Sequence, residues 1–94
     1  MAIRNFKNRA TEQIFNGKLH RRLPQQIQRR AKMRLIQLHS AVSIEDMMLP
    51  PSNRLEKLRG DHAGQYSVRI NNQFRICFNW QEGNAFDVEI VDYH

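Results

Sequence analysis

The last third of the chain alternates between apolar and polar residues, which is the pattern of strands that bury one face. The alternation covers residues 65–70, 74–80 and 86–91. Its apolar positions are Tyr66, Val68, Ile70, Phe74, Ile76, Phe78, Trp80, Phe86, Val88 and Ile90. Alternation with period two over three neighbouring segments predicts an antiparallel meander with one buried face.

The register of the first hairpin follows from this alternation. A two-residue turn would pair apolar with polar positions, and a slip of one residue in a half-buried sheet is heavily penalised. A loop of residues 71–73 keeps the faces separate, because it pairs Val68 with Ile76. The same register places Arg69 opposite Arg75 on the polar face. Directly opposed like charges are destabilising, so this pair suggests an anion between the two arginines.

The first half of the chain has the signals of two helices. Asn8 can cap a helix that runs to about Asn16, and Gly17 then supplies a left-handed stop. A longer helix opens at Leu23-Pro24, with proline near its first turn, and reaches about Ala41. Its apolar stripe comprises Ile27, Ala31, Leu35 and Leu38.

These elements predict one α+β domain that spans residues 1–94, with helices that cover one face of the sheet. We expect further short strands at residues 2–6 and 55–58. Arg34 projects into the apolar stripe of the second helix, so it must either extend to solvent or find a carboxylate. Met33 and Ile36 lie on the far side of that helix, where they are either simply exposed or contact a partner protein.

Composition limits the location of the protein. No run of 18 apolar residues is present, so we expect no membrane span. The first residues have no apolar core of a secretory signal. The single cysteine, Cys77, excludes an internal disulfide and fits a reducing, cytoplasmic environment.

The charge is concentrated in the first part of the chain. The net charge is +6, and residues 1–34 carry ten Lys or Arg against one acid. Eleven of the fifteen cations are arginines, whose forked guanidinium matches phosphate. A basic half indicates a nucleic-acid or ribosome partner, and the alternative is a solvated basic surface.

The polar face of the sheet gathers side chains that suit phosphate chemistry. Arg69 and Arg75 share it with Tyr93, which has the parity of Glu89. Other candidates near this face are Asp92 and His94 at the strand end, and Lys57 and Arg59 in a loop that can reach it. We interpret Arg69, Lys57 and Arg59 as candidates for substrate binding.

Each of these residues also has an ordinary structural reading. Arg75 can pair with Glu89 across the strands, and Tyr93 can be a half-buried strand aromatic. Asp92 can be a cap or an ion-pair partner, and His94 can be a frayed end. No cluster of His, Cys and Asp has metal-binding spacing, and no glycine-rich phosphate loop is present, so we expect neither a metal nor a cofactor.

Three segments together resemble a known family. They are residues 51–61 (Pro-Ser-Asn-Arg-Leu-Glu-Lys-Leu-Arg-Gly-Asp), residues 64–78 with their Phe-Arg-Ile core, and residues 88–94, which end in Asp-Tyr-His. This combination is similar to the HigB-type toxins of bacterial toxin–antitoxin modules, in the RelE/ParE superfamily. The resemblance covers the chain in length and order, and it is tightest from residue 51 onward.

The resemblance implies a RelE-like, microbial-ribonuclease-like fold, in which two N-terminal helices pack on a curved antiparallel sheet. It also implies ribosome-dependent cleavage of mRNA without a metal. In that reaction the 2′-hydroxyl of the message attacks the adjacent phosphate. The products are a cyclic phosphate and a free 5′-hydroxyl.

The site residues are carried over by position. Arg75 matches the family arginine that holds the phosphate, and Arg59 matches a family lysine. Asp92, Tyr93 and His94 match the C-terminal catalytic group. The chain departs from the family in two places: Glu56 stands where some members have a histidine, and Asn71 stands where a second arginine is found. Either Glu56 or His94 is then the general base.

The implied partners are a cognate HigA-like antitoxin, the 70S ribosome and mRNA, with operator DNA reached only through the antitoxin. Two other functions stay open at this stage. One is a ParE-like DNA gyrase poison on the same fold, for which the Asp-Tyr-His end would be incidental. The other is a non-catalytic RNA- or ribosome-binding module.

Overall fold

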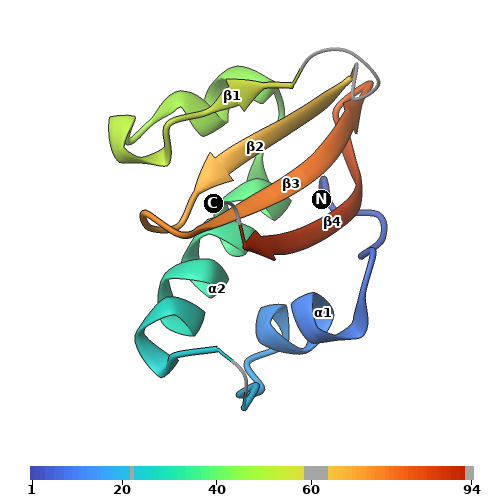
Figure 1. The fold of residues 1–94 in the computed structure, drawn as a ribbon. Helices are drawn as coiled ribbons and strands as arrows, with labels where there is room; N and C mark the ends of the chain where they lie inside the picture. Colours follow the sequence, from blue (N-terminus) through green and yellow to red (C-terminus); the bar gives the residue numbers. More distant parts are fainter. Residues whose placement is uncertain (22, 59–63, 93–94) are drawn as a thin grey trace.

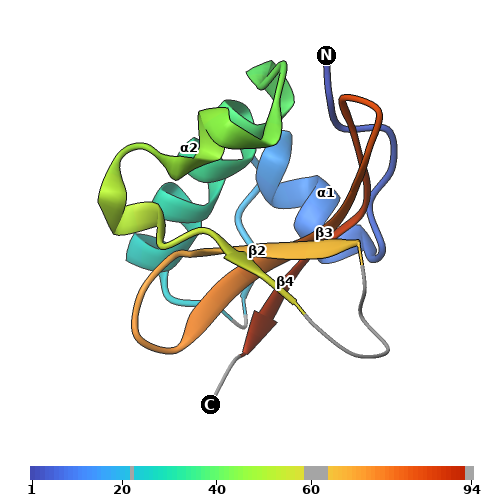
Figure 2. The same cartoon turned by 90° about the horizontal axis from the view of Figure 1, so that it is seen from above.

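The fold is a four-stranded antiparallel sheet with two helices on one face, seen in a computed structural model that describes residues 1–21, 23–58 and 64–92 (Figures 1 and 2). The helices are α1 (Arg9–Phe15) and α2 (Gln25–Ser40), followed by the 3₁₀ helices η1 (Ile44–Met48) and η2 (Pro51–Asn53). The strands are β1 (Glu56–Lys57), β2 (Gln65–Arg69), β3 (Phe74–Gln81) and β4 (Asn84–Asp92), in the sheet order β1-β2-β3-β4. The predicted α+β class is confirmed.

The helix ends follow the sequence signals. The Asn8 side chain accepts a hydrogen bond from the Thr11 amide at 2.9 Å, so it caps α1 as predicted. Gly17, just beyond the end of α1, has a φ of +87°, which glycine adopts without strain. The predicted stripe of α2 is buried in full, and Leu35 and Leu38 are 0% exposed. The helix therefore packs its apolar stripe against the sheet.

The core lies between α2, α1 and the helix-facing side of the sheet. Its fully buried members include Leu35, Leu38, Met47, Val68, Ile76, Phe78 and Val88. Phe78 stacks against Tyr66 and meets Trp80 edge-on, with ring centroids 6.2 and 6.4 Å apart. A core of this kind fixes the register of β2, β3 and β4, because a slip would expose it.

The predicted hairpin register is confirmed. Val68 pairs with Ile76, and Arg69 pairs with Arg75. The loop closes at Ile70, whose amide donates to the Phe74 carbonyl at 2.9 Å. The two arginines therefore stand opposite each other on the sheet face that the helices do not cover.

The prediction for the start of the last strand was wrong in one respect. Phe86 was expected on the buried face with Val88, but Ala85 is the residue buried there, at 0% exposure. A β-bulge at Asp87, where φ is +54°, inserts one residue into β4 and reverses the faces before it. Phe86 consequently pairs with Asn79 on the opposite face.

The first residues pair with β4 but do not form the continuous strand that was expected. Only two parallel bridges join them, Ile3 to Ala85 and Phe6 to Val88. Between these bridges the bulge interrupts the backbone hydrogen bonds. The side chain of Asn5 replaces one of them, because its Oδ1 accepts a hydrogen bond from the Asp87 amide at 2.9 Å. The outer edge of β4 is thereby covered.

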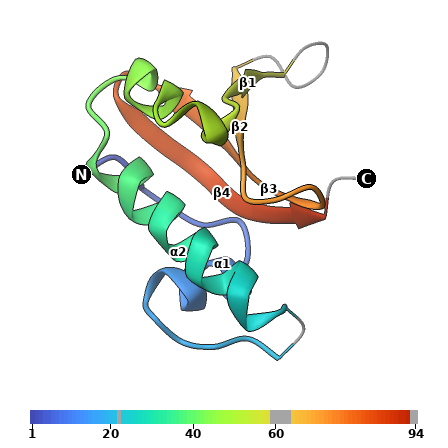
Figure 3. The ribbon, with the colours of Figure 1, turned by 90° about the vertical axis from the view of Figure 1, so that its left-hand side faces the viewer.

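The other edge of the sheet is formed by β1, which is two residues long where a strand at 55–58 was expected. With η1 and η2, β1 lies at the end of the molecule opposite α1 (Figures 1 and 3). The head of Arg34, which was expected in solvent or on a carboxylate, donates from its Nε to the Arg69 carbonyl at 3.1 Å. Among the residues that the structure describes, no helix is long and apolar enough to cross a membrane.

Candidate active site

Arg75 is the centre of the candidate site. It lies on the uncovered face of β3, yet it is only 8% exposed. Its Nε donates to the Ser67 hydroxyl at 2.8 Å, and its Nη2 donates to the Arg54 carbonyl at 2.6 Å and more weakly to the Ser67 carbonyl at 3.3 Å. Burying a guanidinium costs free energy unless its N–H groups are hydrogen-bonded. These acceptors therefore stabilise the buried charge and fix the plane of the guanidinium group.

The Arg54 carbonyl is held in place by the turn before β1. Arg54 ends η2 in the left-handed conformation, with a φ of 43°. Asn53, fully buried beside it, donates from Nδ2 to the carbonyls of Met47 at 3.1 Å and Leu49 at 3.2 Å. The loop between η1 and β1 is thus anchored from inside, which fixes an acceptor for Arg75.

Among the described residues, Glu56 places a carboxylate near Arg75. Glu56 pairs with Ser67 in the sheet register, so it faces the same side as Arg75. Its Oε1 lies 3.9 Å from Arg75 Nη1. The alternative pairing of Arg75 with Glu89 is not the one observed, because the Glu89 carboxylate lies 3.5 Å from Lys7 Nζ.

These groups surround a hollow of ≈ 440 Å³, which we call the Arg75 hollow. It is lined by Arg54, Glu56, Arg69, Asn71, Asn72 and Arg75. Arg69 donates to the Asn72 side chain, which holds its guanidinium beside the β2–β3 turn. Three arginines and one carboxylate give the hollow a positive charge, which suits a phosphate.

The other predicted residues are placed as follows. Asp92 pairs with Phe74, which puts it on the face opposite Arg75, and its Oδ2 accepts from Gln73 Nε2 at 3.1 Å. Lys57 pairs with Tyr66, and its register is likewise that of the opposite face. Arg59, Tyr93 and His94 lie outside the described residues. The structure therefore brings together Glu56, Arg69 and Arg75.

Sequence reasoning missed two groups that position Arg75. Ser67 has the same parity as Arg69 and Arg75, so the alternation could have placed it on this face. Arg54 contributes a backbone carbonyl, and no side-chain pattern signals that. Asn71 and Asn72 were read as turn residues, although their side chains also line the hollow.

Neither a metal site nor a reactive cysteine is built into the described part of the chain. Within residues 1–21, 23–58 and 64–92, no group of three His, Cys, Asp or Glu side chains could hold a metal ion. Burial raises the pKa of the Cys77 thiol, and the nearby Glu89 carboxylate raises it further. A raised pKa keeps the thiol protonated, whereas a nucleophilic cysteine needs a lowered one.

Comparison with known proteins identifies the family. Residues 4–94 match the family model described as "RelE-like toxin of type II toxin-antitoxin system HigB". "Toxin HigB-1" of Vibrio cholerae is 36% identical over 83 residues, which is 87% of either chain. "Endoribonuclease HigB" of Proteus vulgaris is 27% identical over 92 residues, covering 98% of this chain and 99% of the relative.

A solved structure supports the fold alone. The YoeB dimer from Staphylococcus aureus superposes with a TM-score of 0.60 at 18% identity, over 100% of this chain and 97% of that chain. Membership of the family also implies a cognate antitoxin. The chain with its buried Arg75 and arginine-lined hollow belongs to the HigB-like family, the RelE-like toxins of type II toxin–antitoxin systems.

Proposed function

We propose that this toxin is an endoribonuclease that cuts mRNA on the ribosome by metal-free attack of a 2′-hydroxyl on the adjacent phosphate. One observation carries the proposal: Arg75, nearly buried, stands opposite Arg69 and lines a hollow with Arg54 and the carboxylate of Glu56. The relative from Proteus vulgaris is named an endoribonuclease, which supports the same reaction.

The reaction requires positive charge where the phosphorane forms. The 2′-oxygen bonds to phosphorus, the bond from phosphorus to the 5′-oxygen breaks, and a 2′,3′-cyclic phosphate and a 5′-hydroxyl result. Negative charge grows on the equatorial oxygens during this step. Arg75, already desolvated and oriented by Ser67, stabilises that charge more in the transition state than in the ground state.

Two proton transfers complete the step. Glu56, 3.9 Å from Arg75 Nη1, takes the proton of the 2′-hydroxyl as general base. By the family resemblance, Tyr93 and His94 deliver a proton to the leaving 5′-oxygen, with His94 as the alternative base. Asp92 takes no direct part in this step, because its register places it on the opposite face. Arg59 and Arg69 bind the flanking RNA backbone, whereas Lys57 is excluded from this role by its register on the opposite face.

The ribosome contributes the geometry that this small site lacks. A toxin with few strong bases gains most when its substrate is already held in an attack-ready conformation. The basic first part of the chain provides a surface for ribosomal RNA. A HigA-like antitoxin neutralises the toxin in the cytoplasm, and it alone contacts operator DNA.

Primer extension on a defined message, with and without translating ribosomes, tests the proposal. We expect cuts only with ribosomes, and a loss of at least about 10²-fold for Arg75→Gln. Glu56→Gln, at an exposed position, should lower the rate while the circular dichroism spectrum is unchanged. Glu45→Gln, which makes the same change at an exposed position outside the hollow, should cut normally.

Two outcomes would overturn the proposal. Intact message in every lane despite growth arrest, with accumulated DNA breaks, would indicate gyrase as the target. Wild-type cutting by folded Arg75→Gln and Glu56→Gln variants would show that the Arg75 hollow is not the site.

A further inference from the structure

A second hollow lies directly beside the Arg75 hollow. It has a volume of ≈ 580 Å³, and α2 forms one wall with Arg29, Arg30, Met33 and Arg34. The opposite wall is the β2–β3 turn. We call this second space the α2 hollow, and it is distinct from the site described above because neither Arg75 nor Glu56 lines it.

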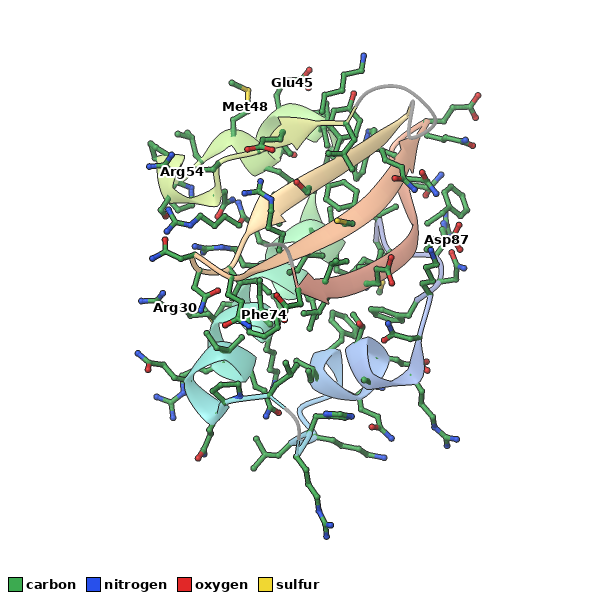
Figure 4. All side chains as sticks on the ribbon, viewed as in Figure 1. Arg30, Glu45, Met48, Arg54, Phe74 and Asp87 are labelled. Carbon is green, nitrogen blue, oxygen red and sulfur yellow. The ribbon has the colours of Figure 1, made fainter. Side chains whose placement is uncertain are left out.

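The two hollows share the β2–β3 turn as a wall. Both are lined by Arg69, Asn71 and Asn72. Figure 4 shows Arg54, of the Arg75 hollow, and Arg30, of the α2 hollow, at the same side of the molecule, where this turn lies. An extended ligand that occupies both hollows would therefore pass this turn, beside Arg69.

The charge of the α2 hollow suits an anion. Arg29, Arg30, Arg34 and Arg69 line it, and none of its lining residues is a carboxylate. Arg34 is fixed there, because its Nε donates to the Arg69 carbonyl. Burial lowers the pKa of Arg34, and the adjacent Arg30 guanidinium lowers it further. Both effects mean that the charged form of Arg34 is disfavoured by its surroundings, and a bound anion would offset this.

The shape of the wall favours a nucleic-acid strand over an isolated ion. Met33, 63% exposed, lies among the arginines and gives the hollow an apolar surface. Guanidinium forks match phosphate oxygens, and a flexible thioether packs against bases or riboses of any sequence. An exposed methionine among arginines therefore fits a ligand in which charged and apolar groups alternate, as they do along a nucleic-acid strand.

We propose that the α2 hollow is a second phosphate subsite, which binds a backbone phosphate of the same message strand that the Arg75 hollow holds at its scissile phosphate. The inference rests on the proposed ribonuclease function and extends it to the flanking nucleotides. Arg29 and Arg30 are the phosphate ligands, and Met33 contacts the adjoining nucleoside. Arg69 belongs to the wall that the two hollows share, and Arg34 lines the α2 hollow alone.

The first test measures binding without cleavage. A short single-stranded RNA, made uncleavable by 2′-O-methyl groups, is titrated by fluorescence anisotropy with the wild type and with Arg29→Gln/Arg30→Gln. The matched control is Arg9→Gln/Arg21→Gln, which removes two exposed arginines outside both hollows.

We expect the double variant in α2 to bind about tenfold more weakly. Its plot of log affinity against log salt should lose about 0.7 of slope, the value for one single-strand phosphate. The control should lose less than half of that slope. Equal losses in the two double variants would overturn the subsite, because they would reflect net charge alone.

The second test locates the phosphate. Messages that carry one neutral methylphosphonate at successive positions around the cut are assayed on translating ribosomes. We expect a methylphosphonate at one flanking position to raise the apparent KM of the wild type about tenfold. The same substitution should leave the apparent KM of Arg29→Gln/Arg30→Gln unchanged, because that variant has already lost the contact.

The remaining outcomes refute the message-strand assignment. If no message position matters and the variant binds vacant ribosomes more weakly, the phosphate belongs to ribosomal RNA. If only antitoxin binding weakens, the hollow receives an acidic protein segment. A wild type that cuts nothing would refute the proposed function, and the anisotropy test would still decide whether the hollow holds an RNA phosphate.

Discussion

Removal of the Ser67 hydroxyl should destabilise the protein through the buried charge of Arg75. Ser67 is 0% exposed, and its Oγ accepts from Arg75 Nε at 2.8 Å. Ser67→Ala leaves this N–H without its acceptor in a place that water hardly reaches. A hydrogen bond to a charged group contributes about 1.5–3 kcal/mol, so we expect a loss of about 2 kcal/mol.

Chemical denaturation with urea measures this loss, and a thermal scan should show a fall in Tm of about 8 °C for a domain of this size. Ribosome-dependent cleavage by Ser67→Ala should also slow, by about tenfold, because the guanidinium plane is no longer fixed. The slower cleavage should be a change in kcat, since the charge itself is retained.

A double-mutant cycle isolates the contact. In an Arg75→Met background the N–H donor is absent, so Ser67→Ala should cost less than about 0.5 kcal/mol. An equal loss in both backgrounds would refute the reasoning, because the cost would then come from packing around Ser67 alone.

The stability should depend on pH through Asp46, whose pKa is lowered by hydrogen bonds from the backbone amides of Val42 and Ser43. Because the folded pKa of Asp46 lies below the ordinary 3.8, the stability that Asp46 contributes is fully present above that pH and is lost as the pH falls through the folded pKa. Asp46→Asn should therefore reduce the loss of unfolding free energy that urea denaturation measures at acidic pH. An unchanged acid dependence would contradict the assignment to Asp46. Leu38→Ala, at a fully buried position, should cost about 2–5 kcal/mol in urea, whereas Ile36→Ala, on the exposed side of the same helix, should cost less than about 0.5 kcal/mol. Similar losses at both positions would mean that the outer side of α2 is also packed.

Sequence reasoning succeeded where one physical constraint was dominant. The hairpin register was predictable because residues 71–73 are the loop that keeps Val68 and Ile76 on one face. The Arg69–Arg75 pair followed from the same parity. The burial of α2 was predictable because its stripe recurs at helical spacing.

It failed where local geometry overrides alternation. The bulge at Asp87 has no signal in the hydrophobic pattern, since Phe86 is a better core residue by type than Ala85. The support of Arg75 by the Arg54 carbonyl depends on a left-handed backbone that only the folded turn reveals.

The pairing of the first residues with β4 has a consequence for how the protein is made. Ile3 and Phe6 meet Ala85 and Val88, so a segment that is synthesised before both helices pairs with one that is synthesised after them. Domains fold as units once their long-range contacts can form, and such contacts slow folding. A nascent chain that has not yet released β4 therefore lacks the strand that completes the sheet, and the fold closes only after synthesis has passed that strand.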